Sequence, residues 1–458
     1  MRPSSESLLD TIAALATPLG RSAIALLRVS GSRTREILAR IAPDLPEDPE
    51  PRRPHLVLLV DAGGEPIDRG FVTLFVAPAS FTGEDLAELS VHGSPVVAEK
   101  LLRALVSAGA RPARAGEFSE RAFRLGKMDL VEAEAIRDLI ESRTGAAALA
   151  STKRLEGALS SRLRQTREDL LAAAASLTAT VDFSEDVGEI VDPAVSARLT
   201  AAREALARLA ASWNTGRLLS AGCRVAILGR PNAGKSTLFN ALCGTERAIV
   251  TDVPGTTRDV LDATLDVRGI PVELVDTAGL RDARDEVERI GIERARGEGE
   301  KAAAVLYVFD ASIGWTPEDR EAVASLDGKP VAIVANKIDR LGGVAGARPD
   351  RPAGDVLSLC GLAPDAGAKL LDLLERTVAS GVTSDSASEV LGSVRQRDLV
   401  ERARAAACEA LDALERGVSP EYAATHVDSA LAALADVFGE TTSEEVLERI
   451  FSTFCIGK

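Results

Sequence analysis

Residues 229–236 have the sequence Gly229-Arg-Pro-Asn-Ala-Gly-Lys-Ser236, which indicates the fold of the central part of this chain. It fits the pattern G-x-x-x-x-G-K-[ST], in which glycines let the backbone wrap a phosphate and the lysine adds a positive charge. The apolar run Arg224–Leu228 before it predicts a strand, and Ser236–Leu242 after it predicts a helix. A strand, a glycine-rich loop and a helix in this order indicate a nucleotide-phosphate site.

Three further motifs accompany this loop, each near the end of a predicted strand. They are Gly255-Thr-Thr-Arg-Asp259, Asp276-Thr-Ala-Gly279 and Asn336-Lys-Ile-Asp339. The Asp339 carboxylate can accept two N–H donors from a guanine edge, a pair that adenine does not offer. The hydroxyls of Ser236 and Thr257 are suited to binding Mg²⁺. Together the four motifs predict a guanine-nucleotide site.

The pattern of apolar residues along the chain changes three times. Short apolar runs with Gly and Pro between them predict strands in residues 1–120, with a helix at Ser94–Ala108. Apolar residues at three- and four-residue spacing, without proline, predict helix over Leu130–Gly145 and a long helix over Ala146–Val181. Continuous apolar strands alternating with helices then predict a parallel sheet, before a helical pattern returns. The strands predicted are Ile24–Val29, His55–Val60, Gly70–Val76, Leu86–Val91, Arg224–Leu228, Val272–Val275, Val305–Phe309, Val331–Ala335 and Val356–Leu359.

We therefore expect a multidomain protein with an inserted module. The predicted parts are an α+β N-terminal domain (1–120), an all-α helical domain in two pieces (121–215 and 381–458), and an α/β P-loop GTPase domain (216–380) inserted between those pieces. The ends of an inserted module are expected to lie close together in space.

Composition narrows the functional classes. The 458 residues carry 54 basic and 69 acidic side chains, a net charge of −15, which argues against a surface that coats nucleic acid throughout. No apolar segment reaches the roughly 20 residues that a membrane-spanning helix needs. The five cysteines are scattered and form no Cys-x-x-Cys pair, and three histidines are too few for a His-rich metal site. We expect a cytoplasmic protein with no membrane partner.

The residue that orients the water for GTP hydrolysis is not evident from the motifs. Many small GTPases have a Gln directly after the Asp-x-x-Gly motif to orient that water, but here the position is Leu280. The charged segment that follows offers four carboxylates in its place, and their pattern alone does not choose among them. They are Asp282, Asp285, Glu286 and Glu288.

At this point the residues resemble those of a known family. Besides the four nucleotide motifs, the matching stretches are Asp10-Thr-Ile-Ala-Ala-Leu-Ala-Thr-Pro18, Phe81-Thr-Gly-Glu-Asp85, Ala115-Gly-Glu-Phe-Ser-Glu-Arg-Ala-Phe123, Asp285-Glu-Val-Glu-Arg-Ile-Gly-Ile-Glu293 and Phe454-Cys-Ile-Gly-Lys458. Essentially the whole chain resembles the MnmE (TrmE) family of tRNA modification GTPases.

The resemblance implies a reaction and its participants. With an FAD-containing partner protein, MnmG (GidA), the family adds an aminomethyl or carboxymethylaminomethyl group to carbon 5 of the wobble uridine of tRNA. The implied cofactors are GTP, Mg²⁺, K⁺ and a folate of the 5-formyltetrahydrofolate type. The family also implies a homodimer formed through the N-terminal domain.

The same resemblance assigns roles to individual residues. It makes Glu288 the water-orienting carboxylate and Cys455 a functional thiol, and it places K⁺ against Asn232, Thr251, Val253 and Thr256. Its folate pocket maps to Arg28, Glu88, Lys127 and Lys458. The residues implied in GTP binding are Asn232, Ala233, Gly234, Lys235, Ser236, Thr237, Thr251, Asp252, Val253, Pro254, Gly255, Thr256, Thr257, Asp276, Thr277, Ala278, Gly279, Asn336, Lys337 and Asp339.

The chain departs from the family pattern at the last nucleotide motif. Where the family usually has Ser-Ala-Lys or Ser-Ala-Arg, the strand here ends in Ser358-Leu359-Cys360, so the usual side chain over the base is missing. Two alternative functions remain at this stage. One is an Era-like ribosome-assembly GTPase that acts as a switch, and the other is a folate-dependent one-carbon transferase with a regulatory GTPase domain.

Overall fold

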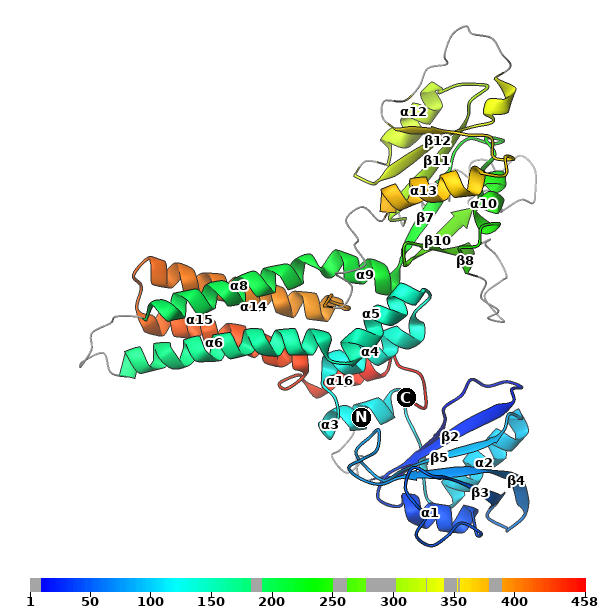
Figure 1. Cartoon of the computed structure of the whole chain (residues 1–458), viewed down its shortest axis with the longest axis vertical. Coiled ribbons are helices and arrows are strands. Elements are labelled where there is room, and N and C mark those ends of the chain that lie inside the picture. The colour runs from blue at the N-terminus through cyan, green and yellow to red at the C-terminus, as the bar shows by residue number, and fades with distance from the viewer. Residues whose placement is uncertain are drawn as a thin grey trace. The chain divides into compact units, whose positions relative to one another are not determined.

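The computed structural model describes residues 10–182, 192–249, 262–276, 302–326, 328–341, 352, 355–378 and 389–458 (Figure 1). The chain divides into two compact units. Unit 1 is drawn from Met1–Arg137, Leu155–Arg203 and Asp398–Lys458, and unit 2 from Asp138–Arg154 and Glu204–Arg397.

Unit 1 contains a six-stranded sheet with the order β3-β4-β5-β2-β1-β6. All neighbours pair antiparallel except β1 and β6, which pair parallel over two residues. The predicted strands are present, and β1 and β6 are additions that the sequence pattern did not indicate. The strands are β1 (Ile12–Leu15), β2 (Ile24–Ser30), β3 (Pro54–Val60), β4 (Pro66–Phe75), β5 (Leu86–His92) and β6 (Arg111–Pro112).

Two helices, α1 (Thr34–Ile41) and α2 (Pro95–Ser107), supply the apolar cover of this sheet. Ile37 of α1 and Leu101 of α2 are fully buried in one cluster with Leu27 and Leu89 of the strands. Pro95 occupies the first turn of α2, where the missing N–H costs nothing because that group has no partner within the helix.

The remaining helices of unit 1 include α6 and α15, which pack along each other. The predicted single helix over Ala146–Val181 is wrong, because the chain breaks between α5 and α6 at Gly157, whose φ of +84° is left-handed. Such a backbone angle ends a right-handed helix. Helices α4, α8 and α14 contribute residues to both units. The helices outside the sheet are α3 (Glu117–Arg124), α4 (Leu130–Glu141), α6 (Ala158–Asp182), α8 (Pro193–Ala211), α14 (Val394–Glu415), α15 (Pro420–Phe438) and α16 (Glu444–Phe451).

Unit 2 is built around a seven-stranded sheet with the order β13-β12-β11-β7-β10-β9-β8. The five strands from β13 to β10 run parallel, and β9 and β8 add an antiparallel edge. Its elements are α5 (Gly145–Leu155), α9 (Trp213–Ala221), β7 (Cys223–Leu228), α10 (Lys235–Cys243), β8 (Ala248–Ile249), β9 (Asp262–Val267), β10 (Ile270–Asp276), β11 (Ala304–Asp310), α12 (Pro317–Ala324), β12 (Val331–Asn336), η2 (Ile338–Arg340), β13 (Val356–Ser358) and α13 (Ala366–Val378).

The two faces of this sheet bury different clusters. Helices α10 and α13 cover one face, where Leu238 and Leu374 are buried with the apolar side chains of β7 and β10. The other face packs around Trp315 and Leu326, which flank α12. All seven residues of β11 are buried, as expected for a central parallel strand covered on both sides. The parallel strands consequently end at one edge of the sheet, where their polar residues gather.

Within the described residues, no helix is both long enough and apolar enough to cross a membrane.

Candidate guanine-nucleotide and folate sites

The loop between β7 and α10 has the backbone that its glycines predict. Gly229 and Gly234 have φ angles of +144° and +99°, and Asn232 is also left-handed at +62°. A Cβ on Gly229 would lie 2.0 Å from Val308 O. A side chain at Gly229 would therefore force the loop away from β11, and the glycine allows this close approach.

Lys235 is held inside this loop. Its Nζ donates to Gly229 O at 2.8 Å and to Arg230 O at 2.9 Å. Ser236 and Thr237 follow in the first turn of α10, where backbone N–H groups point away from the helix and attract an anion. The ammonium, the hydroxyl and the helix N-terminus thus lie together at the carboxyl end of β7.

Asn336 joins two neighbouring loops across the strand ends. Its buried side chain donates from Nδ2 to Ala233 O at 3.0 Å, and its Oδ1 accepts from Lys337 N and Gly361 N at 2.8 and 2.9 Å. Both polar atoms of the amide therefore bond to loop backbone. The Asn336 side chain therefore fixes the spacing between the phosphate loop and the loop after β13.

Lys337 has a partner that the sequence analysis missed. Its Nζ donates to Asn232 O and forms an ion pair of 2.8 Å with Asp310. Partial burial opposes ionisation of Asp310, but hydrogen bonds from Lys337 and Ser312 hold its pKa below the ordinary value. Asp310 ends the buried strand β11, and that position at the carboxyl edge was the available signal. Asp339 lies exposed in η2, with its carboxylate accessible.

The loop after β13 places its turn later than the expected motif. Leu359 N still bonds to Ala335 O, so Leu359 continues the sheet. The chain then turns between Cys360 and Ala363, where Ala363 N donates to Cys360 O at 2.9 Å. Gly361 contacts Asn336, and Leu362 is 82% exposed. Through Asn336, Gly361 is therefore linked to the phosphate loop, and the exposed Leu362 follows it.

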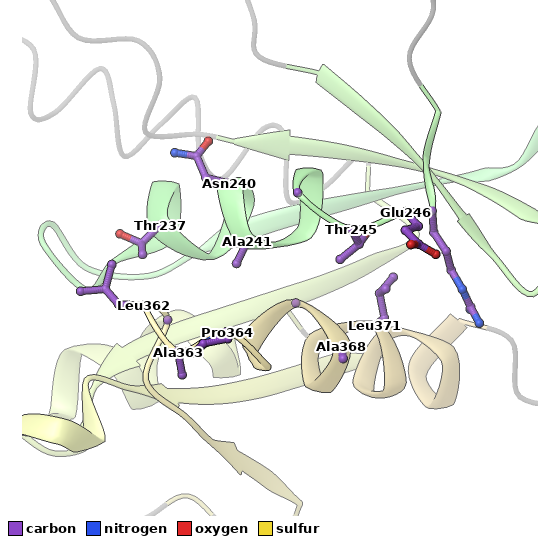
Figure 2. Close-up of a pocket in the computed structure, with 14 residues that line it drawn as sticks. Thr237, Asn240, Ala241, Thr245, Glu246, Leu362, Ala363, Pro364, Ala368 and Leu371 are labelled. Atoms are coloured by element: carbon purple, nitrogen blue, oxygen red, sulfur yellow. The ribbon is translucent and has the colours of Figure 1, made fainter.

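A groove of about 830 Å³ continues from this turn between α10 and α13. Figure 2 shows Thr237 and Leu362 at one end of the groove and Glu246 at the other. Small residues, among them Ala241, Gly367 and Ala368, line its middle together with Leu371.

Several predicted nucleotide residues lie outside the described part of the chain. The backbone of Asp276 ends β10 in register with Ile227 of β7, as expected for a strand-end residue beside the phosphate loop. The structure does not describe Thr251, Asp252, Val253, Pro254, Gly255, Thr256, Thr257, Thr277, Ala278, Gly279 or Glu288.

A second polar cluster lies in unit 1. Arg28 of β2 and Glu88 of β5 are directly opposite each other, and Arg28 Nη2 lies 2.9 Å from Glu88 Oε1. Their side chains are only 16% and 28% exposed. The Arg28 guanidinium also lies 5.8 Å from the centre of the Phe81 ring. A carboxylate, a guanidinium and an aromatic face are the groups that a flat heterocycle with amide and amine donors requires.

The last residues of the chain complete this cluster. Arg28 Nη1 donates to Gly457 O at 3.1 Å, and Phe118 N donates to Lys458 O at 3.2 Å. Burial, and then the charge of Arg28, lower the pKa of Lys458. Phe454 is buried against Phe451 and so anchors the segment. Three of the four predicted folate residues, Arg28, Glu88 and Lys458, are therefore gathered in one place.

Lys127 and Cys455 occupy separate positions. Lys127 Nζ donates to Pro78 O at 2.9 Å, and its stem lies beside Gly83. It contacts the segment that carries Phe81 rather than Arg28 directly. The Cys455 thiol is exposed, while its carbonyl accepts from Gly116 N at 3.3 Å. All five cysteines are free thiols.

A phosphate loop, an Asn-Lys-x-Asp motif and strand-end carboxylates on a largely parallel sheet define a P-loop protein that binds guanine nucleotides. Comparisons with known proteins extend this class. The family described as the MnmE helical domain matches residues 130–455, and the GTP-binding protein TrmE N-terminus matches residues 11–127.

Whole-chain relatives agree with these matches. The tRNA modification GTPase MnmE of Aquifex aeolicus is 38% identical over 98% of this chain and 100% of its own length. Those of Roseiflexus castenholzii and Alkalilimnicola ehrlichii are 41% and 42% identical, each over 98% of this chain and 99% of theirs. The chain belongs to the MnmE family of tRNA modification GTPases, and it is a GTP-hydrolysing enzyme.

Proposed function

We propose that this enzyme, with an FAD-containing partner of the MnmG type, adds an aminomethyl or carboxymethylaminomethyl group to carbon 5 of the wobble uridine of tRNA. The observation that carries the proposal is the joint presence of the phosphate loop and the Arg28–Glu88–Lys458 cluster in one chain. A GTPase that served only as a ribosome-assembly switch would have no use for the second cluster. Membership of the family supplies the tRNA substrate class.

The cluster in unit 1 suits a reduced folate. Glu88 can accept hydrogen bonds from the amide and amine of a pterin, while Arg28 and Lys458 can bind its carbonyl or the carboxylates of its glutamate tail. This partly buried site beside Phe81 contains two cationic side chains and one carboxylate, so its net positive charge suits an anionic folate. Bound there, the folate would supply a one-carbon unit. Lys127 would meet the ligand from the side of Pro78.

Cys455 would contribute an exposed thiol next to Lys458. A proton on the Lys458 ammonium is easier to lose than on a solvated lysine, because the pKa of that group is lowered by burial. We propose that Cys455 and Lys458 face the site at which the tRNA is modified.

Deletion and complementation test the proposed reaction. In a strain lacking this gene, we expect the wobble uridine to lose its carbon-5 substituent, and wild-type protein to restore it. Arg28→Ala should fail to restore it, because the carboxylate of Glu88 loses its partner and the folate loses a cation. Nucleoside analysis of purified tRNA measures this outcome.

Arg53→Ala is the matched control, since Arg53 is an exposed arginine of the same unit paired only with nearby Glu50. It should restore the modification fully. Unchanged wobble uridine in the deletion strain would reject the proposed reaction and favour the Era-like alternative. Full restoration by Arg28→Ala would reject the folate assignment while leaving the reaction intact.

For GTP hydrolysis we propose the twenty nucleotide-binding residues named above, with Ser236 and Thr257 holding Mg²⁺ and Glu288 orienting water. We also propose K⁺ at Asn232, Thr251, Val253 and Thr256, where the cation would supply positive charge beside the phosphates. Support within the described residues comes from Asn232, which stands exposed and left-handed in the phosphate loop.

Replacing Na⁺ by K⁺ should therefore raise GTP turnover by at least about tenfold, because a positive charge placed at the transition state strengthens catalysis. Asn232→Gly should abolish the increase, and it keeps the left-handed backbone open to the loop. Asn240→Ala, at an exposed position of α10, is the control that should retain it. Phosphate release measured in K⁺ and in Na⁺ tests this prediction, and equal turnover in the two salts would reject the K⁺ site.

We further propose a homodimer formed through unit 1. Leu56 of β3 and Phe71 of β4 are cross-strand partners, and they are 57% and 48% exposed. Contiguous exposed apolar patches mark association surfaces, and we propose that these two side chains form part of one. The cytoplasm is the proposed location, in keeping with a tRNA substrate.

A further inference from the structure

Helix α5 packs against the sheet that carries the nucleotide site. It follows α4 in the sequence, yet its Ala150 is buried in the same apolar cluster as Val225 of β7 and Leu274 of β10. Both ends of α5 are also fixed by polar contacts. These contacts all lie within unit 2.

At the N-terminal end of α5, one hydroxyl is shared between the helix and the sheet. Thr144 Oγ1 accepts from Ala147 N at 3.2 Å, as a helix-capping hydroxyl does. The same oxygen donates to Gly269 O at 2.6 Å. Thr144 is only 6% exposed, so water does not readily replace that bond. The cap of α5 therefore holds the turn between β9 and β10.

The turn is shaped for this contact. Arg268 and Gly269 have φ angles of +52° and +86°, the left-handed pair that a tight two-residue hairpin needs. Gly269 N donates to Asp266 Oδ1 at 2.6 Å, which fixes the turn internally. A Cβ on Gly269 would lie 2.4 Å from the Cβ of Ala146, so only glycine lets the turn reach α5. The hairpin and the helix are thus in direct contact.

Strand β10 connects this turn to the nucleotide site. It begins at Ile270, next to the turn, and ends at Asp276, beside the phosphate loop. Along this length, β10 is hydrogen-bonded to β7 on one side and to β9 on the other. A shift at Asp276 would therefore reach Gly269 and Thr144.

At the C-terminal end, α5 is fixed by a buried arginine. Arg154 is 1% exposed, forms an ion pair of 3.0 Å with Asp138, and donates to Ser220 Oγ of α9 at 3.4 Å. Its Nη1 lies against Gly392, where a Cβ would be 1.4 Å away. Arg154 therefore touches both the segment entering the sheet and the segment leaving it.

We propose that α5 couples the nucleotide site to the segments around α9 and Gly392. When bound nucleotide shifts β10, the Thr144–Gly269 hydrogen bond transmits that shift to α5. Arg154 then transmits the shift from α5 to α9 and Gly392. Thr144 acts through Gly269 and touches no nucleotide, so it is a positioning residue. One readout below rests on the proposed tRNA reaction, and the other does not.

Hydrogen exchange of the full-length protein tests the coupling directly. In the wild type, GDP with aluminium fluoride should change amide exchange in α5 relative to the nucleotide-free protein. In Thr144→Val, which keeps the shape and removes the hydroxyl, that change should fall at least about fivefold. GTP turnover should stay within about twofold of the wild type, while tRNA modification falls at least about fivefold.

Thr152→Val is the matched control, because Thr152 Oγ1 donates only to Ala148 O of the same helix, at 2.9 Å. Thr152→Val should leave both the exchange response of α5 and tRNA modification at the wild-type level. Thr144→Ser, which keeps the hydroxyl, should also retain both. A wild-type exchange response in Thr144→Val, or an equal loss in Thr152→Val, would overturn the proposal. If the wild type leaves tRNA unmodified, the proposed reaction fails, yet the exchange experiment still decides the coupling.

Discussion

Replacing Lys235 by alanine is expected to lower GTP turnover by at least about a hundredfold. The Lys235 ammonium is already held inside the phosphate loop by two backbone carbonyls, at 2.8 and 2.9 Å. The loop therefore holds the ammonium in place, so that it loses little freedom on contacting phosphate oxygens. A charge fixed in advance where negative charge develops is worth more than one that must be ordered during the reaction.

Phosphate release and titration with a fluorescent GTP analogue together measure this effect. Lys369→Ala provides the control, because Lys369 is an exposed lysine of α13 paired with Asp365 one turn away. It should leave turnover unchanged. A Lys235→Ala protein that keeps its thermal stability and still hydrolyses GTP at the wild-type rate would contradict the assignment of the phosphate loop.

The second large effect concerns stability. Glu117 is completely buried, and its carboxylate accepts from Arg111 at 2.7 Å, from Arg114 N at 2.8 Å and from Arg121 at 3.2 Å. Replacing it by glutamine leaves three arginines, Arg111, Arg114 and Arg121, facing a neutral amide. Breaking a buried ion pair by removing one partner typically costs about 3–5 kcal/mol. We expect Glu117→Gln to lower the free energy of unfolding of unit 1 by about that amount.

The pH dependence follows from the same contacts. Burial opposes ionisation of Glu117, but hydrogen bonds from Arg111 and Arg114 N lower its pKa from 4.5 to about 2. A carboxyl group whose pKa is lower in the folded state stabilises the protein above its unfolded pKa. That contribution is lost as the pH falls from about 4.5 to about 2. The difference in free energy of unfolding between wild type and variant should therefore be largest near neutral pH and should become smaller in acid.

Calorimetry at several pH values measures this difference, with separate transitions assigned to the two units because a multidomain chain need not unfold in one step. Glu99→Gln removes an exposed carboxylate of α2 that pairs with Arg103. Its cost should stay within about 1 kcal/mol. A Glu117→Gln cost as small as this, or one that grows in acid, would show that the buried network does not stabilise the unit.

The class of the central domain and most of its strands could be predicted from the amino-acid sequence. The motif at Gly229–Ser236 and the continuous apolar runs are local patterns, and each needs only a few adjacent residues to be read. They located β7, β10, β11, β12 and β13 and the residues at their ends. Resemblance then supplied the family, because its motifs are distributed over the whole chain.

The contacts between distant segments, in contrast, became visible in the folded structure. Arg28 meets Gly457 across 429 positions of sequence, and Asp310 meets Lys337 between two strands. The break at Gly157, the late turn at Gly361 and the attachment of α5 to the hairpin of β9 and β10 were also invisible. Each depends on which backbone lies opposite a residue after the chain has packed. The local sequence pattern indicates which secondary structure a segment favours. Which other segments it contacts depends on burial and hydrogen bonding over the whole fold.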